Sequence, residues 1–64
     1  MMIVSVYKLD KDGYRKKSHD VLRAKSVRIS DEDCDVIYIT LWNGVKWKVD
    51  MNKYDVEVQL RTFP

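Results

Sequence analysis

The sequence has few of the residues that build enzymatic and metal sites. Its 64 residues include one cysteine, one histidine, one proline and two glycines. The single thiol of Cys34 cannot form an intramolecular disulfide or a thiolate metal cage, so we expect a reducing, cytoplasmic setting. The longest apolar run, residues 1–4, is far shorter than the about 20 residues of a membrane helix, and no basic-then-apolar leader is present. We therefore expect a protein that neither spans a membrane nor is secreted.

The small size limits what the core contributes to stability. A chain of 64 residues has room for one domain, residues 1–64, and buries only about 60% of its unfolded surface on folding. A core of this size is worth roughly 3–5 kcal/mol when no disulfide or metal assists it. Large apolar residues such as Ile37, Ile39 and Trp47 are therefore expected to be structural.

Charge is unevenly distributed along the chain. The net charge is +2, but residues 1–28 carry eight Lys/Arg against three Asp, and residues 29–64 carry four Lys/Arg against seven Asp/Glu. The two parts thus have charges of +5 and −3. Such asymmetry steers charged partners, although strands from the two parts interleave in a β fold and much of the separation cancels in space.

Alternation of apolar and polar residues with a period of two dominates the sequence, which is typical of β-strands. The pattern predicts strands at residues 2–9, 24–30, 35–41, 45–49 and 56–60. The polar and basic residues 14–20 fit either a loop or an extended ribbon, and we favour the extended form. Asn52 and Lys53 are expected in a short turn or a single 3₁₀ turn before the last strand.

The second strand needs an irregularity. Leu22 and Ala24 have the opposite parity to Val27 and Ile29. Because successive side chains of a strand point to opposite faces, all four can face inward only if one extra residue is accommodated. A β-bulge is therefore expected near residues 25–26.

The hairpin around Trp42-Asn43-Gly44 has two possible registers. A two-residue turn at Asn43-Gly44 would place both tryptophans on one face and set Ile37 and Ile39 beside lysines. A three-residue turn with a left-handed Gly44 instead pairs Leu41 with Val45 and collects the apolar residues on one face. We prefer the three-residue turn, which leaves Trp42 exposed.

The layout of five strands, one early loop, a tight hairpin and a short polar crossing resembles that of SH3-like barrels. The resemblance covers about residues 24–60, and residues 52–58 resemble the short helix and final strand of that fold. The tyrosine-rich motif and the paired tryptophans of the peptide-binding families are missing, so proline-rich peptide recognition is not implied. The expected fold is all-β: a small five-stranded antiparallel SH3-like barrel or a strongly bent meander sheet. An OB-like fold is the alternative.

Catalytic and metal sites are not indicated. His19 with Asp20 and Cys34 has the residue types of a nucleophilic site, but neighbours in a strand point to opposite faces and nothing places Cys34 nearby. The carboxylates at positions 31, 33 and 35 alternate as in a calcium loop, but its glycine position falls on Val36 and its glutamate position on Trp42. We expect no enzyme activity, no metal and no cofactor.

A basic segment supports nucleic-acid binding as the second hypothesis. Six cations and one aromatic ring, the mixture used on phosphates and unstacked bases, occur between residues 14 and 28. They are Tyr14, Arg15, Lys16, Lys17, Arg23, Lys25 and Arg28. Ten carboxylates and the lack of a base-reading motif weaken this interpretation.

Protein binding is the leading hypothesis. An exposed Trp42 flanked by Tyr38, Lys46 and Lys48 forms an amphipathic patch of the kind enriched at interaction hot spots; the alternative is a Trp42 tucked into the barrel rim. The chain has the size of small phage or mobile-element inhibitors that dock on a host protein. Pairing of two copies through an edge strand is a third possibility, since small sheets expose edges.

Overall fold

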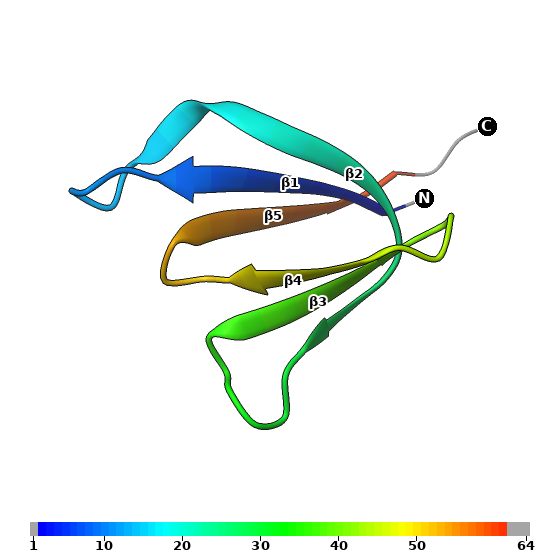
Figure 1. The fold of residues 1–64 in the computed structure, drawn as a ribbon. Coiled ribbons are helices and arrows are strands. Elements are labelled where there is room, and N and C mark those ends of the chain that lie inside the picture. Colours follow the sequence, from blue (N-terminus) through cyan, green and yellow to red (C-terminus); the bar gives the residue numbers. More distant parts are fainter. Residues whose placement is uncertain (1, 62–64) are drawn as a thin grey trace.

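The computed structural model describes residues 2–61 and consists of one antiparallel sheet of five strands (Figure 1). The strands are β1 (Met2–Leu9), β2 (Arg15–Ile29), β3 (Val36–Leu41), β4 (Lys46–Asp50) and β5 (Tyr54–Leu60). Their order in the sheet is β4-β3-β2-β1-β5. The prediction of an all-β fold with five antiparallel strands is confirmed, and residues 2–61 contain no helix.

Strand β2 connects two parts of the sheet. It has 15 residues, curves strongly in Figure 1, and pairs with β1 up to Ala24 and with β3 from Ala24 onward. The register shifts between Ala24 and Ser26, which is the expected bulge. The extended form favoured for residues 14–20 is also confirmed from Arg15 onward. We call β5, β1 and β2 up to Ala24 the first half-sheet, and β2 from Ser26, β3 and β4 the second half-sheet.

The hairpin between β3 and β4 has the three-residue register. The Leu41 N–H donates to the Val45 carbonyl at 2.9 Å, and the Gly44 N–H donates to the Leu41 carbonyl at 3.0 Å. Gly44 has a φ of +88°, a conformation that costs an L residue about 1–2 kcal/mol. Trp42 is consequently 66% exposed at the hairpin tip, as the preferred register predicted.

The crossing into β5 is a hydrogen-bonded turn, without a 3₁₀ helix in the described residues. The Lys53 N–H donates to the Asp50 carbonyl at 3.0 Å, and Asp50 Oδ1 accepts the Asn52 N–H at 2.9 Å. The Met51 N–H donates to the Asp35 carbonyl at 2.7 Å, which ties the crossing to the start of β3.

Both half-sheets contribute to one core on the inner face. The buried cluster contains Val4, Val6 and Ala24 from the first half-sheet, and Ile37, Ile39 and Val49 from the second. Trp47 is partly buried against it, in agreement with its expected structural role. The bulge at Lys25 brings Ala24 and Val27 to the same side, because it absorbs the odd residue between them.

The sheet is open. Strands β4 and β5 are its two ends, and each has one hydrogen-bonded neighbour among the described strands. The hydrogen bonding therefore shows a single sheet with two edges and no closed barrel. The part of the chain that the structure describes has no helix of the length and apolarity needed to cross a membrane.

Candidate binding face

The outer face of the second half-sheet brings together residues from both predicted sites. Arg28, Tyr38 and Lys48 lie in one cross-strand row, since Arg28 is opposite Tyr38 and Tyr38 is opposite Lys48. The neighbouring row contains Ser26, Thr40 and Lys46. These residues alternate with the buried Ile37 and Ile39, so they point away from the core. We call the two rows the polar rows.

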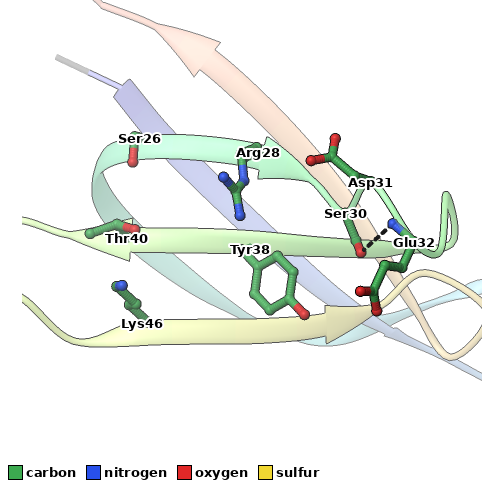
Figure 2. A pocket seen from close by; sticks show the side chains of 8 residues that line it. All are labelled: Ser26, Arg28, Ser30, Asp31, Glu32, Tyr38, Thr40 and Lys46. Atoms are coloured by element: carbon green, nitrogen blue, oxygen red, sulfur yellow. Dashed lines mark hydrogen bonds between the residues drawn. The ribbon is translucent and has the colours of Figure 1, made fainter.

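Five of the six residues of the polar rows, all except Lys48, line a shallow hollow of about 550 Å³ (Figure 2). The loop after β2 closes one end of the hollow with Ser30, Asp31 and Glu32. Ser30 Oγ accepts the backbone N–H groups of Glu32 and Asp33, both at 3.3 Å, which shapes this loop. The hollow thus has cations and hydroxyls along its floor and two carboxylates at one end.

The cations of the polar rows form no salt bridge within the described chain, although Asp31 and Glu32 line the same hollow. Arg28, Lys46 and Lys48 form no salt bridge with another residue of the range 2–61; both salt bridges found there belong to Arg15. Tyr38 lies between Arg28 and Lys48 in the row and adds an aromatic ring with a hydroxyl. The face therefore presents positive charge and hydrogen-bond donors to a ligand.

Trp42 extends this face at the end opposite the acidic loop. It lies in the connection between Leu41 and Val45, next to the strand ends that carry Thr40 and Lys46. The Lys25 ammonium lies 5.9 Å from the Trp42 ring centroid, near the outer limit of a cation–π contact. The ring remains largely exposed, which leaves it available to a partner.

The basic segment does not form one surface. Tyr14 is exposed just before β2, Lys16 and Lys17 are exposed at its beginning, and Arg23 lies opposite Ile3 on the first half-sheet. Lys25 lies under Trp42, and only Arg28 belongs to the polar rows. The structure therefore distributes the seven predicted nucleic-acid-binding residues over both half-sheets and both ends of β2.

Arg15 is engaged within the first half-sheet. Its Nε donates to Asp55 Oδ2 at 2.6 Å, its Nη1 donates to Glu57 Oε2 at 3.1 Å, and its guanidinium carbon lies 4.4 Å from the Tyr7 ring centroid. The hydrogen bond to Asp55 raises the pKa of Arg15 above its ordinary value, with a smaller contribution from Glu57. This arginine is already paired and is poorly placed to bind phosphate.

The residues with the chemistry of a nucleophilic or metal site are His19, Cys34 and the neighbouring aspartates. His19 lies on β2 and its ring stacks on that of Tyr7, with centroids 4.3 Å apart. Cys34 is exposed in the loop before β3. Ligand atoms of Asp33, Cys34 and Asp35 lie within 4.8 Å of one another, all exposed. Asp33 Oδ1 accepts the Asp35 N–H at 2.9 Å, so this carboxylate stabilises its own loop.

Sequence reasoning placed Tyr38, Lys46 and Lys48 on one face but missed the contribution of β2. Arg28 and Ser26 of β2 complete the polar rows, beside Tyr38 and Thr40 of β3 that the predicted hairpin register already placed outward. The signal was present, because the predicted bulge determines which face Arg28 occupies; the missing element was the pairing of β2 with β3.

Comparison with protein-family models, with curated proteins and with solved structures finds no match to this chain.

Proposed function

We propose that the protein is a small non-enzymatic interaction module that binds an acidic segment of another protein across the polar rows, with Trp42 as its apolar anchor. The observation that carries this proposal is the alignment of Arg28, Tyr38 and Lys48 in one row, where neither cation forms a salt bridge with a described carboxylate. A bound segment with carboxylates would supply the missing negative charge, and Ser26 and Thr40 would donate hydrogen bonds to it.

The arrangement also specifies how the segment lies. Asp31 and Glu32 repel further carboxylates at one end of the hollow, and Trp42 offers apolar surface beyond the other end. The partner segment therefore has its acidic residues over the polar rows and an apolar residue near Trp42. Docking of this protein on such a segment of a host protein is compatible with an inhibitor. We also propose a reducing, cytoplasmic setting in which the exposed Cys34 stays a free thiol.

The magnitudes assign different roles to these residues. Exposed ion pairs are worth only about 0.2–1 kcal/mol each, so Lys46 and Lys48 mainly govern the association rate and its salt dependence. An aromatic anchor at an interface is commonly worth about 2 kcal/mol or more. Trp42 is therefore expected to determine the residence time of the complex.

The scaffold of this proposal is an SH3-like barrel that is open between β4 and β5. Its support is the strand order together with β2, which is shared by two half-sheets. The polar rows lie on the outer surface of that scaffold. Recognition of proline-rich peptides is not part of the proposal.

The proposal is tested by affinity capture from a lysate of the source cell, with matched charge-reversal variants. Lys46→Glu combined with Lys48→Glu alters the polar rows, and Lys16→Glu combined with Lys17→Glu makes the same charge change at the beginning of β2. A protein retained by the wild type and by the Lys16/Lys17 variant, and reduced at least about tenfold by the Lys46/Lys48 variant, supports the proposal. Equal retention by both variants contradicts it.

Nuclease treatment separates the alternative, an RNA- or DNA-binding module. Material that disappears on nuclease treatment, and that the Lys16/Lys17 variant loses as strongly as the Lys46/Lys48 variant, would show that the whole basic segment binds phosphates. Amide chemical shifts recorded during titration with a glutamate-rich peptide and with oligothymidylate locate each surface. The proposal expects the peptide to perturb Arg28, Tyr38 and Lys48 at low salt.

A further inference from the structure

The two edges of the open sheet differ in how they are protected. Strand β4 carries Lys46 and Lys48 among its five residues, and an edge lysine discourages pairing with another strand. Strand β5 has no lysine among its seven residues. By this criterion the β5 edge is open to pairing and the β4 edge is not.

The backbone groups available on the β5 edge follow from its pairing with β1. The Leu9 N–H donates to the Lys53 carbonyl at 2.9 Å, so this opposed pair is hydrogen-bonded. Hydrogen-bonded pairs alternate along an antiparallel ladder, so Asp55, Glu57 and Gln59 also direct their backbone groups toward β1. The backbone N–H and C=O groups of Val56, Val58 and Leu60 therefore point outward from the sheet.

The same three residues carry the apolar side chains of this edge. Val58 is opposite the buried Val4 and is 44% exposed, and Leu60 is opposite Met2 and is 79% exposed. Exposure thus increases toward the end of the strand. The edge combines unpaired backbone groups with uncovered apolar surface, which are the two features of a strand that pairs with another chain.

We propose that a second copy of this chain pairs with β5 in an antiparallel, two-fold symmetric manner centred on Val58. This register places Val58 opposite its own counterpart and Val56 opposite Leu60 of the second copy. These are the residues with outward backbone groups, so each opposed pair exchanges two backbone hydrogen bonds. The apolar side chains of the two copies then lie on one continuous inner face.

Charge disfavours the neighbouring register that is centred on Glu57. Centring on Val58 places Glu57 opposite Gln59 and Asp55 opposite Arg61 of the second copy, with no like charges directly opposed. Centring on Glu57 would oppose two glutamates, which is destabilising. Arg15 further reduces the repulsion between copies, because it pairs with Asp55 and Glu57 at 2.6 and 3.1 Å.

The test measures sedimentation velocity over roughly a hundredfold range of protein concentration, because dimerisation follows mass action. The wild type is expected to shift from monomer to dimer, and Leu60→Lys is expected to remain monomeric throughout. Val58→Lys provides a second edge variant, and each variant is first checked for a wild-type far-ultraviolet circular dichroism spectrum. Val21→Lys is the matched control, since Val21 is also an exposed apolar residue but lies on the central strand β2.

The register is tested by an isotope-filtered nuclear Overhauser experiment on a mixed labelled and unlabelled sample. Glu57 and Gln59 of different copies form a non-hydrogen-bonded pair, so their Hα atoms come close together, whereas within one strand they are far apart. A Glu57 Hα to Gln59 Hα contact between copies supports the proposal. A concentration-independent monomer, a dimer that Leu60→Lys leaves unchanged, or a dimer without this contact overturns it.

This inference does not depend on the proposed function, because it uses the outward backbone groups and the apolar side chains of β5 and none of the polar rows. Lys46→Glu combined with Lys48→Glu should leave the dimer intact, and Leu60→Lys should leave capture of the partner protein intact. Failure of one proposal is therefore distinguishable from failure of the other.

Discussion

The two half-sheets share one core but differ in how their outer faces balance charge. On the first half-sheet, Arg15 lies between Asp55 and Glu57 and over the Tyr7 ring. On the second, Arg28 lies beside Tyr38 and Lys48 without a salt bridge to another described residue. The number of cations in a segment therefore does not locate a binding surface. Carboxylates contributed by a distant strand decide which cations remain available.

The largest expected effect concerns the shared core. Ile39 is fully buried in the second half-sheet, and Ile39→Ala should cost about 2–5 kcal/mol. A core of this size contributes only roughly 3–5 kcal/mol, so most molecules should unfold. Urea titration followed by Trp fluorescence and by the amide resonances of β1 and β5 measures the loss.

The amide resonances of β1 and β5 in the Ile39→Ala variant show whether the two half-sheets unfold cooperatively. These resonances should lose their native shifts together with those of β3. Native shifts retained in β1 and β5 would show that the first half-sheet folds by itself. Val21→Ala is the control, because Val21 is exposed and its truncation should change stability by no more than about 0.5 kcal/mol.

A smaller effect distinguishes the two arginines. Arg15→Met should lower the melting temperature, because Asp55 and Glu57 are then left next to each other without their cation. Arg28→Met should leave stability within about 0.5 kcal/mol, because it breaks no salt bridge with a described residue. Melting at low and at high salt measures both variants.

Salt provides the internal control of this comparison. The deficit of Arg15→Met should shrink at high salt, which screens exposed charges. An equal loss of stability in both arginine variants would remove the distinction between a self-neutralised and an available face.

For Trp42→Ala the expected effect on stability is small. The ring is 66% exposed and its contact with Lys25 is at the outer limit of a cation–π interaction, so the free energy of unfolding should fall by less than about 1 kcal/mol. Urea titration followed by the remaining Trp47 measures this change. Binding of the partner protein should weaken strongly. Unfolding of this variant would instead place Trp42 among the structural residues and contradict its assignment to the binding face.

Much of the fold was predictable because its signals are local. The first strand, the bulge and the three-residue hairpin follow from side-chain parity and from one glycine, Gly44. Two features were not local. The polar residues of β2 extend as far back as Arg15 because β1 pairs with them, and the opening between β4 and β5 depends on sheet curvature, which no short pattern encodes.

The candidate face was half predictable for the same reason. Tyr38, Lys46 and Lys48 follow from the hairpin register alone. The place of Arg28 depends on how β2 aligns with β3, and the engagement of Arg15 depends on carboxylates 40 and 42 residues away. Contacts across such separations cannot be derived from neighbouring residues.

The bulge at Lys25 has a consequence for how the sequence can change length. The bulge adds one residue between the inward-facing side chains before it and those after it in β2. A one-residue deletion there would turn the β2 side chains on one side of the bulge to the opposite face of the sheet. Ser26 and Arg28 would then point toward the core, and Val27 would become solvent-exposed. Insertions and deletions should therefore be tolerated in the loops at residues 10–14 and 30–35 but not within β2.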